Sequence, residues 1–79
     1  YTKAIQLEPT ASRYTYRGIS YYNLEQYQTA INDYTTAIQL DPDYAWAHYI
    51  RAFVYRNLGQ TAKAYADDAM ACSLDSYYC

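Results

Sequence analysis

A repeat of 34 residues constrains the fold of this chain more than any other feature of its sequence. Identical residues recur at that offset in the pairs Arg17/Arg51, Tyr21/Tyr55, Leu24/Leu58, Ala30/Ala64 and Asp33/Asp67. A fixed period of about 20 to 50 residues indicates a solenoid, in which one supersecondary unit stacks on the next. The sequence therefore predicts a stack of similar units.

The repeat also divides the chain. The opening segment 1–9 reappears as 34–42 at an offset of 33, so the second half of a repeat stands at the start of the sequence. We expect the last helix of a preceding repeat and its loop at 1–10, complete repeats at 11–44 and 45–78, and the start of a further repeat, or a terminus, at Cys79. Because the sequence opens within this pattern, we expect the chain to be part of a longer protein.

Each repeat is predicted to contain two helices joined by a tight turn. The i, i+4, i+7 spacing of one helical face starts at Tyr14 and resumes at Tyr27 after a short break. Gly59 is placed to adopt the left-handed conformation that ends a helix. Pro9 and Pro42 are expected to end helices, because proline lacks the backbone donor. The expected helices lie at about 1–7, 11–24, 27–40, 45–58 and 61–74, and no strand is expected.

These features resemble the tetratricopeptide repeat family, both in the period and in the run RGISYYNLEQYQTAINDYTTAIQLDP at 17–42. The family pattern of aromatic, small and proline residues falls on Tyr14, Gly18, Tyr21, Ala30, Tyr34, Ala37 and Pro42. The second repeat departs from it at His48, Ala52, Asp68 and Ser76. The resemblance implies an all-α fold, in which antiparallel helix pairs stack as a right-handed α-solenoid of about two and a half units.

The small residues of the pattern have a physical role that does not depend on the family. Gly18 and Ala30 would let the two helices of a repeat approach closely, and Ala37 would let one repeat meet the next. The equivalent positions of the second repeat hold Ala52, Ala64 and Ala71. Larger neighbouring side chains then fill the remaining volume.

The polar residues are interpreted as structural. We expect Asp67 to make a polar contact to Arg17 or Arg51, and we expect His48, at a position usually taken by a packing aromatic, to be a structural histidine. Asp67 and Asp68 are adjacent on a helix and point in different directions, which makes them poor paired carboxylates. The sequence contains no glycine-rich phosphate loop, zinc pattern or calcium loop. It therefore indicates a protein that is not an enzyme and uses no cofactor.

The composition narrows the class of partner. A net charge of -2, with six basic residues that form no run, argues against nucleic acid. No apolar stretch approaches the ~20 residues that span a bilayer. Tyrosine is abundant, with 13 residues against one Phe and one Trp, and its apolar ring with a polar tip suits half-buried and interface positions. A protein or peptide partner is the expected one.

The first helix of each repeat would, by the resemblance, line a concave face, which is a ready groove for an extended or helical peptide. The inward positions of these helices are rich in aromatic side chains, and Thr15 is expected on the same face. The expected partner-binding residues are Tyr16, Tyr22, Trp46, Tyr49, Phe53 and Arg56. An alternative interpretation of Trp46, Tyr49 and Phe53 is ordinary packing against a neighbouring helix.

The two cysteines are too few for a disulfide framework and have no metal-ligand spacing with His48. If a helix continued from Cys72 to Cys79, their Cα atoms would lie about 10 Å apart, beyond disulfide reach. We therefore expect Cys72 to be a small buried side chain and Cys79 a free thiol. The alternative is a disulfide between them, which requires the chain to turn back after Leu74.

Two functional hypotheses follow. The leading one is a non-enzymatic protein-protein interaction scaffold that binds a peptide or helix in the aromatic concave groove. The alternative is a structural subunit that self-assembles end to end into a superhelical fibre, because the helices at both ends leave apolar faces uncovered. A scaffold would be cytoplasmic and a fibre subunit extracellular, and the sequence does not choose between these locations.

Overall fold

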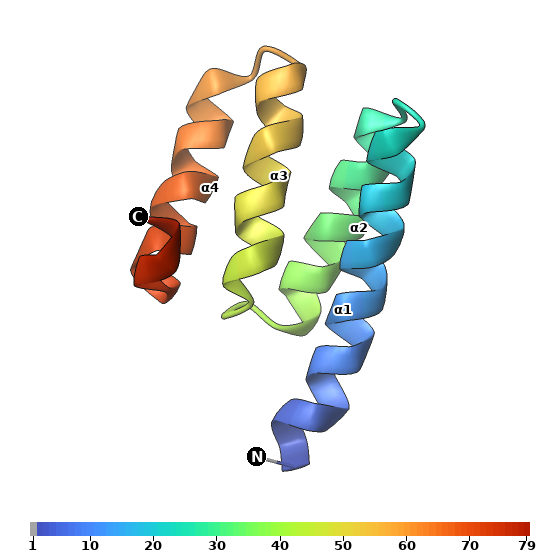
Figure 1. Cartoon of the computed structure of the whole chain (residues 1–79), viewed down its shortest axis with the longest axis vertical. Coiled ribbons are helices and arrows are strands. Elements are labelled where there is room, and N and C mark those ends of the chain that lie inside the picture. The colour runs from blue at the N-terminus through green and yellow to red at the C-terminus, as the bar shows by residue number, and fades with distance from the viewer. Residues whose placement is uncertain (1) are drawn as a thin grey trace.

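A computed structural model describes residues 2–79, with side chains from residue 11 onward. In that range the chain forms four α-helices, α1 Thr2–Asn23, α2 Tyr27–Leu40, α3 Ala45–Asn57 and α4 Thr61–Leu74, followed by the 3-10 helix η1 Ser76–Tyr78. Each α-helix packs against the next and runs antiparallel to it (Figure 1). The described part of the chain contains no strand. The predicted all-α fold of stacked helix pairs is confirmed.

The first helix is longer than the sequence predicts. Pro9 is expected to end a helix, but α1 continues from Thr2 to Asn23 without interruption, and its first turns extend past the ends of the other helices (Figure 1). A proline removes one backbone donor and can bend a helix without ending it. The predicted separate helix at 1–7 is therefore wrong. The assignment of residues 1–10 to a preceding repeat stays a prediction, and their side chains lie outside the described residues.

The turns within the two repeats have the same backbone geometry. Gly59 has a φ of 75°, the left-handed conformation predicted for it, and Glu25 at the equivalent position has a φ of 63°. In each turn the next backbone amide donates to a carbonyl of the preceding helix. The amide of Gln26 donates to Tyr21 at 2.9 Å, and that of Gln60 donates to Tyr55 at 2.8 Å. Both turns therefore reverse the chain in the same way, although a left-handed conformation is less favourable for Glu25 than for a glycine.

Alanines hold the helices close together. The alanines with no exposed surface are Ala11, Ala30, Ala37, Ala47, Ala52, Ala64 and Ala71. Ala11, Ala37 and Ala47 form one cluster, which joins α1, α2 and α3. Because a methyl side chain allows close backbone approach, the predicted role of Ala37 at the junction of the two repeats agrees with its position.

Tyr34 is the largest fully buried side chain among the described residues, with 1% of its surface exposed. Its ring lies against Gly18, where an added Cβ would be 2.8 Å from Cδ1 and closer still to Cε1. The missing side chain at Gly18 therefore makes room for the ring. Tyr34 also packs with Ile31 and with Val54 of α3, so it connects both repeats. Burial raises the pKa of Tyr34 to about 12.

Each repeat carries the same arginine–aspartate pair between its two helices. Arg17 donates from Nε and Nη2 to the carboxylate of Asp33, both at 2.8 Å, and Arg51 donates to Asp67 from the same atoms, both at 2.7 Å. These hydrogen bonds raise the pKa of both arginines. The predicted polar contact of Asp67 is confirmed and is a bidentate pair in both repeats.

The second pair has further connections. Arg51 also donates from Nη1 to the hydroxyl of Thr35, at 3.1 Å, which ties α3 to α2. His48 is buried, with Nδ1 3.6 Å from the Asp67 carboxylate and Nε2 3.2 Å from the carbonyl of Pro42. Because a carbonyl only accepts, Nε2 donates to Pro42. These contacts agree with the expectation of a structural histidine.

Replacement of Gly18 by alanine tests the close approach to Tyr34. The new methyl group would overlap the buried Tyr34 ring and force it to shift, so we expect Gly18→Ala to lower the free energy of unfolding by about 1 to 3 kcal/mol. This loss exceeds the gain of ~1 kcal/mol in helix propensity. Urea denaturation measures the free energy of unfolding of Gly18→Ala and of a control, Ser20→Ala, at an exposed position of the same helix. The control should differ from the parent chain by no more than about 0.5 kcal/mol. A Gly18→Ala chain as stable as the parent would contradict the packing described here.

The two ion pairs provide a matched comparison. The Arg51 side chain is 18% exposed and that of Arg17 is 57% exposed, so removal of the aspartate leaves a buried charge only in the second repeat. We expect Asp67→Asn to lower the free energy of unfolding by about 3 kcal/mol and Asp33→Asn to lower it less. The free energies of unfolding are measured by urea denaturation. Equal losses in the two variants, or a larger loss for Asp33→Asn, would show that burial of the arginine does not determine how much each ion pair stabilises the fold.

Candidate functional site

A hollow of about 280 Å³ lies between α1 and α3, which both pack against α2. The side chains that line it are Ile19, Tyr22, Asn23, Tyr34, Trp46, Ile50, Phe53 and Val54. Tyr34 reaches it from α2, so the ring that Gly18 accommodates also closes the floor. At the loop end, the Asn57 side chain donates to the Tyr22 hydroxyl at 2.9 Å and connects α3 to α1. The groove expected between the first helices of the two repeats is thus present as a cavity.

Four of the predicted partner-binding residues lie at this hollow. Tyr22, Trp46 and Phe53 line it directly. The ring of Tyr16 contacts that of Trp46 edge-on, with the ring centroids 5.2 Å apart, and extends the aromatic surface beyond the rim. Tyr16 and Phe53 are exposed although both are large and apolar. The structure brings these four side chains together, and their role in binding stays a prediction.

A second, wider hollow of about 680 Å³ adjoins the first at Phe53. It is lined by Tyr49, Phe53, Arg56, Asp68, Tyr77, Tyr78 and Cys79. Arg56 forms an ion pair with Asp68 of α4, and its guanidinium carbon lies 5.8 Å from the centroid of the Phe53 ring. The ring of Tyr49 meets that of Phe53 edge-on at 5.0 Å. Tyr49 and Arg56, the remaining predicted residues, therefore border the same surface.

Thr15 is not part of this surface. Its side chain is fully buried and its hydroxyl donates to the carbonyl of Ala11 at 2.9 Å, within α1. The expectation that Thr15 lies on the concave face is wrong, because one helical turn places it over the buried alanine cluster. A short side chain that satisfies its hydroxyl locally can be buried without an outside partner.

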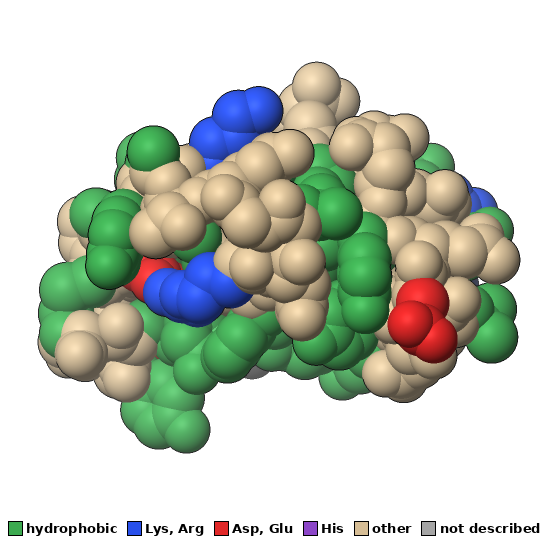
Figure 2. Space-filling view, turned by 90° about the horizontal axis from the view of Figure 1, so that it is seen from above, with side chains coloured by type: hydrophobic (Ala, Val, Ile, Leu, Met, Phe, Trp, Pro, Cys, Tyr) green, Lys and Arg blue, Asp and Glu red, His purple; other side chains and the backbone are tan. Residues whose placement is uncertain are grey.

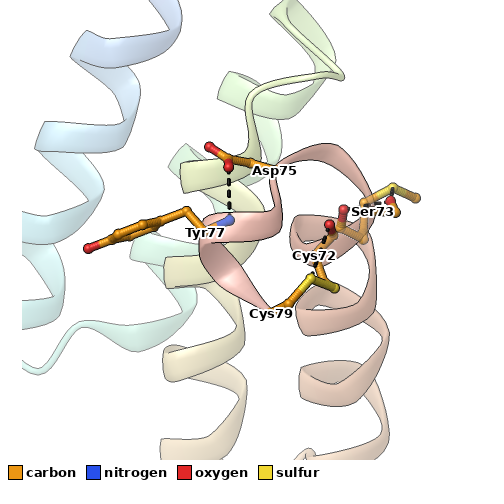
Figure 3. The surroundings of a disulfide bond; sticks show 6 residues. Cys72, Ser73, Asp75, Tyr77 and Cys79 are labelled. Carbon is orange, nitrogen blue, oxygen red and sulfur yellow. Dashed lines mark hydrogen bonds between the residues drawn. A yellow bond between two sulfur atoms is a disulfide. The ribbon is translucent and has the colours of Figure 1, made fainter.

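The two cysteines form a disulfide, with their Cα atoms 4.6 Å apart (Figure 3). Helix α4 ends at Leu74, and the carboxylate of Asp75 accepts a hydrogen bond of 2.9 Å from the backbone amide of Tyr77. This contact starts η1, which returns the chain to Cys72. The expectation that Cys72 is a small buried side chain and Cys79 a free thiol is therefore wrong, because Cys72 is half-buried and bonded to Cys79. The alternative, with the chain turned back after Leu74, is the one observed.

Tyr77 and Tyr78 were not predicted as site residues. The disulfide places both beside the second hollow, and the Tyr78 ring lies 4.7 Å from that of Tyr49. The sequence signal that could have indicated their position is Asp75, directly after the last helix. An aspartate whose side chain accepts from a following backbone amide favours a turn, and so a change of chain direction. Spacing along one helical face could not indicate residues outside the helix.

The surface around the groove has no strong charge of one sign. Seen from above, one acidic side chain lies directly against a basic one, and another lies apart among apolar and polar side chains (Figure 2). Among the side chains that the structure describes, no group of three or more His, Cys, Asp or Glu could hold a metal ion. No helix in the described range has the length and apolar character needed to cross a membrane. The groove presents aromatic and aliphatic surface with a few polar groups.

Comparison with known proteins gives a consistent family. A family model described as a TPR repeat matches residues 18–59. The chain is 32% identical over 65 residues to a tetratricopeptide repeat and J domain-containing co-chaperone of Cryptococcus neoformans, covering 81% of this chain and 12% of that protein.

Two further relatives match over a similar part of the chain. The chain is 41% identical over 68 residues to a 58 kDa phosphoprotein of Plasmodium berghei, with 85% of this chain and 16% of that protein covered. It is 33% identical over 63 residues to human tetratricopeptide repeat protein 13, with 80% of this chain and 7% of that protein covered. The chain thus spans only a small part of the length of these relatives.

Proposed function

Because the chain belongs to the tetratricopeptide repeat family, whose repeats are generally protein-protein interaction modules, we propose that it binds a peptide segment or helix of a partner protein between α1 and α3. The observation that carries this proposal is the apolar hollow between these helices, bordered by exposed aromatic side chains. In this proposal the chain has no enzymatic activity of its own and acts by holding its partner.

The lining of the hollow suits an apolar side chain of a partner protein. Its volume is about 280 Å³. Ile19, Ile50 and Val54 form aliphatic walls, and Trp46 and Phe53 add aromatic ones. One or two apolar side chains of a partner segment would fill this space and lose contact with water.

The rim can fix the direction of the bound segment. Asn23 lines the hollow at the C-terminal end of α1, and Arg56 lies near the C-terminal end of α3, where it lines the second hollow with Phe53. An amide and a guanidinium supply hydrogen-bond donors for the backbone carbonyls of a partner, and the amide also accepts. The walls would supply affinity, and these polar groups would set the register.

The alternative of end-to-end assembly makes a different prediction for the same sample. An assembly subunit would grow with concentration in sedimentation experiments, whereas a binding module would change mass only when it binds a partner. Tyr65 and Met70 are exposed on the surface of α4, and such an assembly would cover them. Substitution of these residues would then reduce association and leave the groove intact.

Peptide binding can be measured at the groove itself, because Trp46 is the only tryptophan and lines the hollow. A displayed library of random peptides is screened against the full chain, and the selected peptides are titrated while Trp46 emission is recorded. We expect Phe53→Ala to weaken binding at least about tenfold, since aromatic anchors dominate such interfaces. Met70→Ala, an exposed residue that lines neither hollow, should leave the affinity unchanged.

Two results would contradict the proposal. Selected peptides that bind with the same affinity to the Phe53→Ala chain, without a change in Trp46 emission, would place binding on another surface. Growth of the free chain with concentration, together with no peptide binding, would instead support the assembly hypothesis.

A further inference from the structure

The C-terminal turn lines the second hollow, which adjoins the first at Phe53. Residues 75–79 fold back from the end of α4, and Cys79 is joined to Cys72 (Figure 3). Within the turn, the Asp75 carboxylate accepts from the amide of Tyr77, and the amide of Cys79 donates to the carbonyl of Ser76 at 3.1 Å. The position of this turn relative to α3 determines the shape of the second hollow.

A row of four aromatic rings crosses from α3 to the turn. The Phe53 and Tyr49 rings are 5.0 Å apart, those of Tyr49 and Tyr78 are 4.7 Å apart, and those of Tyr78 and Tyr77 are 5.1 Å apart. Tyr77 is 84% exposed, and its side chain points away from α4 (Figure 3). Half of this row therefore belongs to a segment that lies outside the helix pairs.

The turn has little else to hold it. A 3-10 helix of three residues makes too few internal hydrogen bonds to persist alone, and chain segments of this kind fray unless they are tied down. The tilted ring contact of Tyr78 with Tyr49 and the proximity of Tyr78 to Tyr44 are non-covalent attachments, and the disulfide is the covalent one. When the covalent attachment is removed, the turn is expected to sample many positions and the second hollow loses its outer wall.

The two hollows are continuous because Phe53 lines both. We propose that the Cys72–Cys79 disulfide assembles the second half of the partner-binding groove, and that reduction of this bond disassembles it. The inference rests on the proposed function. Its occupant is an extended partner segment that places an apolar side chain between α1 and α3 and a ring-bearing side chain, aromatic or proline, on the rings of Tyr49, Tyr77 and Tyr78.

The aromatic row matches that chemistry. Ring faces and edges favour stacked or edge-on contact with another flat, apolar ring, and aromatic-lined grooves accept extended proline-containing segments. The Arg56–Asp68 pair at the edge of the row is partly exposed and nearly neutral as a unit, so it offers a donor and an acceptor to the partner backbone without selecting a charge.

The redox step is an exchange with a dithiol. Cys79 is exposed and Cys72 is half-buried, so a dithiol thiolate attacks Sγ of Cys79 and releases the thiolate of Cys72, which takes up a proton. The second thiol of the reductant then attacks the mixed disulfide and releases Cys79. The dithiol becomes a disulfide, and the two cysteines have gained two electrons and two protons.

The test uses peptides selected on the oxidised full chain and read through Trp46 emission. Each peptide is titrated into the oxidised chain and into the chain reduced with dithiothreitol, with mass spectrometry to confirm the thiol state. We expect reduction to weaken binding at least about tenfold. A shortened peptide without its ring-bearing residue should bind both forms equally, because it uses only the first hollow.

Variants separate the turn from the rest of the fold. The double variant Cys72→Ser, Cys79→Ser should bind like the reduced chain under both conditions, and far-ultraviolet circular dichroism should show that its helices are intact. Tyr77→Ala in the oxidised chain keeps the disulfide and should also weaken binding of the full peptide. Met70→Ala serves as the control on α4.

The outcomes distinguish this inference from the proposed function. Equal affinity in oxidised and reduced chains, or no effect of Tyr77→Ala, would overturn the inference and leave the groove between α1 and α3 as the binding site. Two free thiols in the chain prepared without reductant would also overturn it. If no peptide changes Trp46 emission in either form, both proposals are contradicted.

Discussion

The close approach of helix backbones is the constraint on which the rest of this structure depends. Gly18 and a set of fully buried alanines occupy the lines where helices meet, so the space between helices is too narrow for most large side chains. Only Tyr34, among the 13 tyrosines, is a fully buried large ring in the described part of the chain. The other aromatic side chains that the structure describes are half-buried or exposed, and several of them line the groove. The same packing that holds the repeats together thus provides the aromatic surface.

Directional contacts then set how the helices are placed. The bidentate pairs of Arg17 with Asp33 and of Arg51 with Asp67 occupy the same positions of the two repeats. An aligned guanidinium and carboxylate accept few other geometries, so these pairs orient each helix pair where alanine contacts alone would allow sliding. The bond from Arg51 to Thr35 extends this control across the junction of the repeats and positions α3 against α2. The spacing of α1 and α3, and with it the width of the groove, follows from these contacts.

The sequence could predict the features that repeat and could not predict those that occur once. Periodic spacing is local, so the bounds of α2 and α4 and the left-handed Gly59 were accessible from it. A polar contact of Asp67 was also expected, with Arg17 and Arg51 as alternatives, and the structure shows Arg51. The continuation of α1 through Pro9 could not be predicted from the sequence. A proline can either bend or end a helix, and its surroundings determine which of the two occurs. The disulfide and the placement of Tyr77 and Tyr78 depend on a change of chain direction after Leu74. That turn has a counterpart after Leu40, where Asp41 accepts from the amides of Asp43 and Tyr44 as Asp75 accepts from those of Tyr77 and Tyr78. The disulfide itself has no counterpart, because the position equivalent to Cys79 in the first repeat holds Ala45.

Packing on α2 and the disulfide-closed C-terminal turn bring the aromatic side chains of both hollows into one continuous surface. Nuclear Overhauser effects between ring protons test this directly in the oxidised chain in solution. The account predicts cross-peaks between Tyr16 and Trp46 and between Tyr49 and Tyr78, whose ring centroids are 5.2 and 4.7 Å apart. Intact helices with neither cross-peak would contradict it, because the repeats would then be folded without forming the surface.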